Sequence, residues 1–365
     1  MIDAFTLSSE IRSNVMHWME QSGLLAVLRF ERPGAWQDVW SNLESQPVNY
    51  AASMIDYQHA YMRGSGQSIA DISMVLLNDG KPCAIWPLTL TTGDSSKLSS
   101  QGAPILPPVF ITNLSPRTIK KITASTLRFV VNVQKVLSQE VIESQEYIAP
   151  HVLCAGLSEW HQQWLSIGAA VNVKHDLYVD LALSMDEIRA GFRKSYRPLI
   201  SAGLKAWTAG VMDNDSVEAA TWAEFKLLHR QVAGRSTRSD ETWDLQFEMV
   251  SRGEAMLITL RDTASQNRMI GAGFFQFTRD EGLYAIAAYD RELFDKPLGH
   301  VVQQRAVETM KRRGLRWYRI GERFFPADNP KPTEKELSIS LFKQGFASYL
   351  SPRFVFSLAK GMAAI

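Results

Sequence analysis

Three apolar segments follow one another between residues 255 and 290 with only short polar connections, and this arrangement limits the possible folds more than any other feature. The segments cover 255–261, 268–279 and 282–290. The connection from Arg279 to Gly282 contains Asp, Glu and Gly, which favour turns. The pattern predicts an antiparallel meander of three strands.

Helices and strands are also predicted on both sides of this meander. Alternating apolar residues predict a strand over 174–184, and a helix should begin at the capping box of Ser184 and Glu187. Pro198 should kink or end that helix. The further expected elements are a helix from the capping box of Thr221 and Glu224 to Gly234, helices over 240–252, 298–313 and 333–343, and strands over 315–320 and 349–358.

The first half of the chain repeats this order more faintly. Two apolar runs within 72–90 surround Asn78-Asp79-Gly80, a strong signal for a tight hairpin. A helix over 116–137 and a strand over 147–155 should follow. We therefore expect an α/β fold with mixed sheets in two tandem units, 1–170 and 171–365, whose last strand can return to pack on the first unit.

Composition excludes several classes of protein. Hydrophobic residues make up 45% of the 365 residues and charged residues 21%, as in ordinary globular proteins. The 39 Lys and Arg against 38 Asp and Glu give a net charge of +1, which does not favour a dedicated nucleic-acid binder, although a local basic patch stays open. The two cysteines, Cys83 and Cys154, lie in apolar stretches without zinc-ligand spacing, so we expect core thiols and no metal.

The sequence contains no signal for secretion or membrane insertion. Its first residues lack a basic start with an apolar core, and no apolar run reaches the roughly 18–20 residues of a membrane-spanning helix. We expect a soluble, cytoplasmic protein without a transmembrane segment.

Several segments in the second half resemble one known family. They are Leu-Ala-Leu-Ser184, Leu227-Leu-His-Arg230 with Arg235, Ile270-Gly-Ala-Gly-Phe-Phe, Ala288-Tyr-Asp290 with Lys296-Pro-Leu-Gly299, Arg313-Gly-Leu-Arg-Trp-Tyr-Arg-Ile-Gly321 and Phe342-Lys-Gln-Gly-Phe346. Their order and spacing resemble the FemAB-type, BioF2-like branch of the GNAT acyltransferases, which place two GNAT-like domains in tandem.

The resemblance implies an N-acyltransferase that uses acyl-CoA or aminoacyl-tRNA as donor. It implies amide formation on an amino group of a glycan precursor or nucleotide-linked amino sugar. Two features differ from the family: no heptad stretch supplies a coiled-coil arm, and Asp295-Lys-Pro-Leu-Gly299 replaces the pyrophosphate loop of simple GNAT enzymes.

Four residues are the candidates for catalysis. Lys343 resembles the lysine of the family's Phe-Lys-x-x-Phe segment, and its charge would stabilise an oxyanion. Glu322 and Asp290 lie at the ends of predicted strands, where each could accept a proton, and Tyr289 could donate a hydrogen bond. The alternatives are an exposed lysine on a terminal helix and ordinary turn or core roles for the other three.

A second set of residues could hold anionic parts of a substrate. The helix start at Gly299 and His300, with Lys296 before it, could bind a phosphate or an oxyanion, or could be an ordinary helix start. His229, Arg235, Arg193, Lys194 and Arg197 are candidates for substrate binding, through a nucleotide diphosphate or the backbone of a tRNA. The alternatives are that the basic residues only form a solvent-exposed helix face and that His229 is an ordinary buried imidazole.

Two other functions remain open at this stage. The chain could be a catalytically silent binding or scaffold protein of glycan assembly, or a tRNA-binding aminoacyl transferase of cell-wall or protein modification. Core packing is favoured for the early aromatic residues Trp36, Trp40, Tyr50, Tyr57 and Tyr61, although stacking on a sugar or a base is conceivable.

Overall fold

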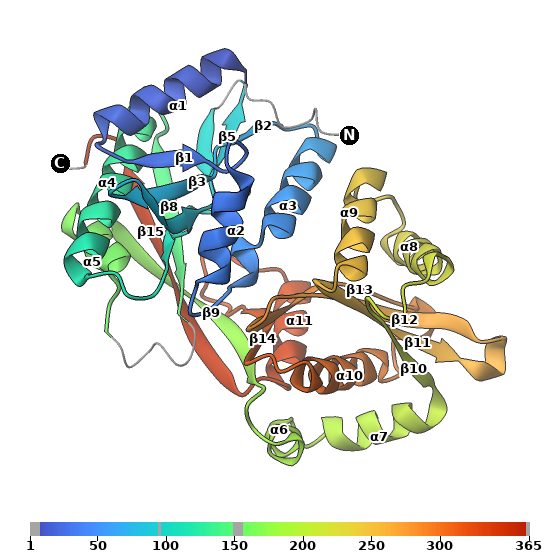
Figure 1. Ribbon diagram of the computed structural model, residues 1–365. Helices are drawn as coiled ribbons and strands as arrows, with labels where there is room; N and C mark the ends of the chain where they lie inside the picture. Colours follow the sequence, from blue (N-terminus) through green and yellow to red (C-terminus); the bar gives the residue numbers. More distant parts are fainter. Residues whose placement is uncertain (1–7, 94–95, 149–155, 363–365) are drawn as a thin grey trace. The chain divides into compact units, whose positions relative to one another are not determined.

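The computed structural model describes residues 8–93, 96–148 and 156–362, and it divides into two compact units (Figure 1). The first unit draws on residues up to 45, residues 49–173 and residues from 353 on; the second contains 46–48 and 174–352. Cys154 and most of the strand predicted over 147–155 lie outside the described residues.

The second unit is built on a twisted sheet whose strands run in the order β10-β11-β12-β13-β14-β9. The strands are β9 (Ala170–Asp180), β10 (Thr208–Met212), β11 (Ala255–Asp262), β12 (Arg268–Phe277), β13 (Glu281–Tyr289) and β14 (Trp317–Arg323). Strands β11, β12 and β13 pair antiparallel, so the predicted meander is confirmed. Strand β10 was not predicted, because it is a short edge strand containing Gly210 and has a single buried residue, Met212.

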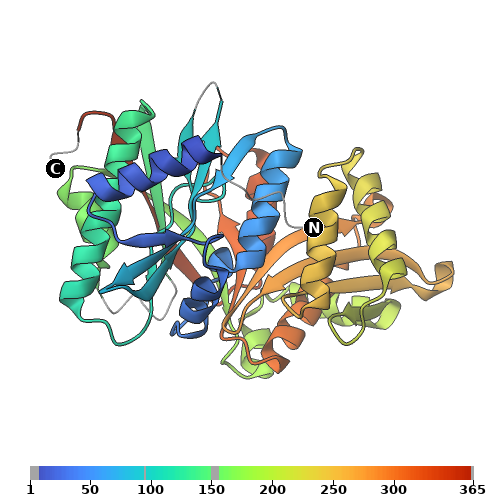
Figure 2. The ribbon, with the colours of Figure 1, turned by 45° about the horizontal axis from the view of Figure 1, so that its top comes forward.

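Helices cover both faces of this sheet (Figures 1 and 2). The helices are α6 (Met185–Gly191), α7 (Tyr196–Ala206), α8 (Ala219–Ala233), α9 (Asp240–Ser251), α10 (Leu298–Arg312) and α11 (Glu334–Gln344). Alternation along β12 separates the faces: the ring of Phe274 contacts Trp222 of α8, whereas Phe275 joins the core beneath α10. Helices α8 and α9 therefore share one face of the sheet, and α7 and α10 share the other.

The predicted helix starts have mixed outcomes. The capping box of Ser184 and Glu187 is confirmed at α6. The box predicted at Thr221 is wrong, because α8 begins earlier and the Thr221 hydroxyl donates to Glu218 instead. Pro198 does not end a helix either. Helix α6 ends at Gly191 and a new helix, α7, begins at Tyr196. Pro198 lies in the first turn of α7, where proline's missing N–H costs little.

Strands β13 and β14 pair over only a short stretch and then separate. They run parallel, and their pairs join Glu281 to Trp317, Gly282 to Tyr318 and Leu283 to Arg319. The remaining residues of β13, up to Tyr289, are not paired with β14. We call the region between the unpaired ends of the two strands the strand gap.

The first unit contains three groups of paired strands and five helices among the described residues. The strand orders are β1-β3-β4-β7 and β2-β5-β6, with β8 paired antiparallel to the later part of β15. The strands are β1 (Ala26–Leu28), β2 (Ser68–Asp71), β3 (Met74–Asn78), β4 (Lys81–Trp86), β5 (Thr89–Thr92), β6 (Lys97–Ser99), β7 (Val109–Phe110), β8 (Val141–Tyr147) and β15 (Tyr349–Ala359). The helices are α1 (Ser9–Gln21), α2 (Pro33–Ser41), α3 (Ala52–Gly64), α4 (Pro116–Val136) and α5 (Glu159–Ser166).

Local signals located the hairpin of this unit correctly. Strands β3 and β4 pair around Asp79 and Gly80, both with positive φ, as the predicted turn requires. Core packing is confirmed for Trp36 and Tyr50, which join one buried cluster. Cys83 is a buried free thiol, as predicted.

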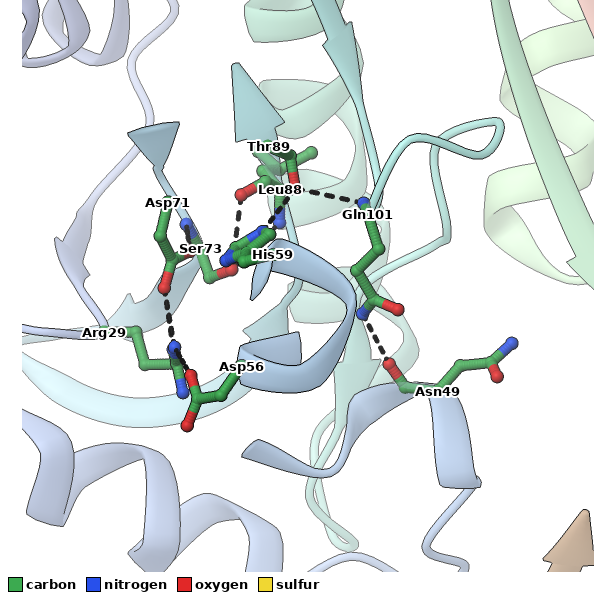
Figure 3. Close-up of polar contacts among 9 residues, drawn as sticks. All are labelled: Arg29, Asn49, Asp56, His59, Asp71, Ser73, Leu88, Thr89 and Gln101. Carbon is green, nitrogen blue, oxygen red and sulfur yellow. Dashed lines mark hydrogen bonds and ion pairs between the residues drawn. The ribbon is translucent and has the colours of Figure 1, made fainter. Parts of the chain in front are cut away.

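A buried polar network links α3 to the strands of the first unit (Figure 3). Arg29 lies 2.7 Å from Asp71 and 2.6 Å from Asp56. His59 is fully buried and contacts the hydroxyl of Thr89 through Nε2 at 2.7 Å. Because a buried charge without a partner costs several kcal/mol, this network ties the elements to one arrangement.

Across the described ranges, no helix is both long enough and apolar enough to cross a membrane.

Candidate functional site

Lys343 lies at the strand gap. It comes from the last turn of α11, and its Nζ lies 5.3 Å from the centre of the Tyr284 ring on β13. On the β14 side it passes over Gly321, where a Cβ atom would come within 2.5 Å of Nζ. Because Gly321 has no side chain, the lysine side chain can occupy the space above it.

Burial changes the acidity of this lysine. It lowers the pKa of Lys343 from 10.5, while Asp176 and Glu322 oppose the shift. None of the hydrogen bonds among the described residues uses its Nζ. An ammonium group that is partly dehydrated and has spare donors can bind an oxygen that gains negative charge.

Three tyrosines and a glutamine line the same region. The hydroxyls of Tyr284 and Tyr289 lie 3.1 Å apart, and the Tyr318 hydroxyl donates to Gln303 Oε1 at 2.6 Å. Burial raises the pKa of Tyr284 to about 12 and raises the pKa values of Tyr289 and Tyr318 well above their usual 10.0. All three hydroxyls therefore keep their protons at neutral pH. The Tyr318 proton goes to Gln303 and one proton joins Tyr284 to Tyr289, so one hydroxyl of that tyrosine pair remains as a donor.

Gln303 adds an amide N–H donor close to Tyr284. Its Nε2 is buried and has no hydrogen-bond partner in the described part of the chain. Buried donors are normally satisfied by protein, water or a ligand. This side of the strand gap is therefore rich in hydrogen-bond donors and suits an acyl carbonyl oxygen.

Two carboxylates lie on the other side of Lys343. Glu322 of β14 is paired directly across from Asp176 of β9, so their side chains share one face of the sheet. Lys174 lies 3.7 Å from Glu322. The carboxylates can hold an ammonium group or accept its proton, as an amine acceptor requires.

The start of α10 borders this site as well. A Cβ on Gly299 would lie 3.1 Å from Phe342 and 3.5 Å from Tyr289. The N-cap residue Pro297 has no side-chain acceptor for the first N–H groups of the helix. Lys296 instead pairs with Asp295 at 2.9 Å on the surface, away from the role expected for it.

His300 packs as an aromatic residue. Its ring contacts Tyr196 edge-on at 4.5 Å and Phe342 at 5.0 Å. Burial and the charge of Arg193 lower the pKa of His300 to about 4, so the imidazole is neutral at pH 7. It supports the residues beside Lys343 and carries no charge for an anion.

Arg193 holds α11 in place. Its guanidinium donates to the Leu341 carbonyl at 2.9 Å and to the Tyr196 hydroxyl at 3.1 Å. The Tyr196 hydroxyl in turn donates to the Phe342 carbonyl at 3.2 Å. These bonds end at the residues just before Lys343, so the structure gives Arg193 a positioning role.

The remaining candidates lie elsewhere or are already engaged. Asp290 pairs with Arg268 at 2.7 Å and accepts from the Glu292 N–H at 3.0 Å, which is the turn role left open by the sequence. Lys194 and Arg197 are exposed around the start of α7. His229 and Arg235 line a separate cavity between α8 and α9.

Sequence reasoning missed Tyr284, Tyr318, Gln303, Asp176 and Gly321. Each lies inside a strand or helix whose apolar periodicity indicates core packing, so nothing in the sequence marked these residues as part of a site. The described residues contain no group of three or more His, Cys, Asp or Glu side chains able to hold a metal ion.

Comparisons with known proteins find similarity in structure alone. No protein-family model matches the chain, and no curated protein matches it in sequence. The structure of FemX is similar to this one, with 12% sequence identity and a TM-score of 0.62. The similar region covers 90% of this chain and 96% of the FemX chain. The predicted likeness to FemAB-type proteins is therefore confirmed for the fold.

Two further solved structures are also similar. The C-terminal domain of a putative lysylphosphatidylglycerol synthetase from Agrobacterium fabrum matches with 11% identity and a TM-score of 0.54, covering 89% of this chain and 92% of that one. L-PGS from Bacillus licheniformis matches with 10% identity and a TM-score of 0.52, covering 84% and 92%. The mixed α/β fold class is confirmed.

Proposed function

We propose that this protein is an acyl- or aminoacyltransferase that forms an amide bond on an amino group. The observation that carries the proposal is the position of Lys343, half-buried at the strand gap between donor side chains and a pair of carboxylates. The shared fold with FemX supports the same reading.

The donor side of the strand gap would bind the acyl carbonyl. When an amine attacks this carbon, a C–N bond forms and the carbonyl oxygen becomes an oxyanion. The Lys343 ammonium would stabilise that oxyanion, and the free hydroxyl proton of the Tyr284–Tyr289 pair would add a second donor. The oxyanion then collapses and the C–S or C–O bond to the leaving group breaks.

The carboxylate side would prepare the acceptor. An amine is protonated at neutral pH and must lose a proton before it attacks. Glu322, across from Asp176, would bind the ammonium group and take this proton, which is released to solvent before the C–N bond forms. The second proton leaves the nitrogen as the amide forms, passes to the same carboxylate and ends on the leaving thiolate or alkoxide. A neutral amine and a polarised carbonyl would then meet at the strand gap.

The identities of the acyl donor and of the amine acceptor are more specific parts of this proposal. An acyl-CoA or an aminoacyl-tRNA would supply the activated acyl group, and an amino sugar of a glycan precursor would accept it. The uncapped N–H groups at Gly299 could hold an anionic part of the donor, since a helix start favours negative charge.

The first test is a screen for the donor. The thermal midpoint would be measured with acetyl-CoA, longer acyl-CoAs, charged and uncharged tRNA and nucleotide sugars, because ligands of the folded state raise it. A donor that raises the midpoint would then be incubated with amines, and amide product detected by mass spectrometry.

The matched control is Lys335→Ala, since Lys335 is an exposed lysine of the same helix. Product formation by the wild type and the control, but not by Lys343→Ala, supports the proposal. Product formation that survives Lys343→Ala and Glu322→Gln together contradicts it, and leaves a silent binding protein or a different site.

A further inference from the structure

A cavity of about 240 Å3 lies between α8 and α9, on the face of the sheet opposite α10. The lining residues are Lys226, Leu227, His229, Arg230, Arg235, Ser236, Thr237, Asp240 and Trp243. This cavity is separate from the strand gap, and the proposed transfer reaction does not use it.

The charge of the lining is positive. The lining contains three cationic side chains, Lys226, Arg230 and Arg235, and one carboxylate, Asp240. The net charge of the lining is therefore +2. The single ion pair within the lining joins Lys226 to Asp240 at 3.5 Å, and the Asp240 side chain is 91% exposed. Among the described residues, neither Arg230 nor Arg235 forms an ion pair.

An aromatic wall and a neutral histidine complete the lining. Trp243 is buried, its ring lies 5.3 Å from His229, and the guanidinium of Arg238 stacks over it at 4.7 Å. Burial and Arg238 lower the pKa of His229 to about 4, so this imidazole is neutral at pH 7. The Thr237 hydroxyl is buried beside the cavity without a hydrogen-bond partner in the described ranges.

We propose that this cavity binds a phosphate dianion, carried by a phosphate monoester or a diphosphate. Two arginines without carboxylate partners can each present a planar fork of donors to phosphate oxygens. The net charge of the lining matches a dianion, and Leu227 and Trp243 offer apolar surface to the group that carries the phosphate.

Calorimetric titration at low salt tests this binding. The probes are inorganic pyrophosphate, adenosine diphosphate and uridine diphosphate, titrated into the full chain. We expect saturable binding, a thermal midpoint that rises with the probe, and affinity that falls as NaCl is added. Tighter binding of a nucleotide than of pyrophosphate identifies a nucleotide as the source, and equal binding identifies the phosphates alone.

The variant Arg230→Gln/Arg235→Gln should bind each probe at least tenfold more weakly. Both arginines are exposed, so the fold should survive, and the thermal midpoint without ligand checks this. The control is Arg312→Gln, an exposed arginine on α10 outside the lining, which should bind as the wild type does. Undiminished binding by the double variant, or no binding of any probe up to about 10 mM, overturns the proposal.

Discussion

The hydroxyls of Tyr284 and Tyr289 lie 3.1 Å apart although the residues are five positions apart on one strand. In a regular strand an odd separation places two side chains on opposite faces. A β-bulge resolves this: Phe274 pairs with Ile286 and Phe275 with Tyr284, so Ala285 is an extra residue. The bulge turns both tyrosines toward the same side, and the ring of Tyr284 lies beside Lys343.

Loss of the Tyr289 hydroxyl should weaken the proposed transfer. In Tyr289→Phe the Tyr284 hydroxyl loses its partner while the ring packing remains, and we expect kcat to fall by about tenfold, the effect of roughly 1.4 kcal/mol on the barrier. Steady-state kinetics measures this. Tyr61→Phe, at an exposed tyrosine of the first unit, is the control, and an equal loss in both variants would remove Tyr289 from the site.

Lys343→Met should strongly slow transfer and stabilise the fold at neutral pH. The thioether keeps an apolar stem of similar length but removes the ammonium, and we expect kcat/KM to fall by about 10²–10³. Because burial lowers the pKa of Lys343, the charged lysine destabilises the wild type near pH 7. Denaturant unfolding would therefore give a higher unfolding free energy for the variant.

The pH dependence of that difference has a defined sign. Between the lowered pKa of Lys343 and 10.5, the unfolded chain binds more protons than the folded one, so stability of the wild type rises with pH. The advantage of Lys343→Met should be greatest below this window and shrink toward pH 10.5. An advantage that grows with pH would contradict the assigned environment of Lys343.

Gly321→Ala should displace Lys343. The new Cβ would lie 2.5 Å from Nζ, and φ at this residue is +140°. We expect lower stability and a large loss of kcat. Gly314→Ala is the matched control, because φ there is +82° with nothing within 4 Å: it should lose about 1 kcal/mol of stability to backbone strain and keep its activity. Equal activity losses in both variants would argue against the clash.

Asp71→Asn should destabilise the first unit. It leaves the buried guanidinium of Arg29 without a main partner, a change that typically costs about 3 kcal/mol, measurable by denaturant unfolding. Asp56→Asn, at the more exposed partner of the same arginine, should cost less. The reverse order of the two losses would show that Asp56 is the dominant partner.

Burial opposes ionisation of Asp71, but Arg29, His59 and hydrogen bonds from Ser73 lower its pKa below 3.8. A lowered carboxyl pKa contributes stability that is present above 3.8 and lost as pH falls through the folded-state value. The difference between the wild type and Asp71→Asn should therefore be constant near neutral pH and narrow below about pH 4. If the difference in unfolding free energy between the wild type and Asp71→Asn grew below about pH 4, the lowered pKa of Asp71 would be contradicted.

Elements defined by neighbouring residues were predictable from the sequence. The hairpin at Asp79-Gly80, the capping box at Ser184 and the helix ends at Gly234 and Gly314 depend on backbone conformations that a few adjacent residues determine. Failures occurred where a distant partner decided the outcome. Glu224, which a capping box at Thr221 needs, instead pairs with Arg261 at 2.6 Å and accepts from the Met269 N–H at 2.9 Å, and α8 begins before Thr221.

The candidate site divides in the same way. Lys343, Glu322 and Tyr289 were selected from the sequence by family likeness and by their places at element ends. The bulge at Ala285, the separation of β13 from β14 and the space above Gly321 arise from pairing and packing between segments tens of residues apart. Periodicity in the sequence thus determined which segments are strands and helices. Only the tertiary structure decided which side chains meet, because strand register and helix packing depend on contacts that no local pattern encodes.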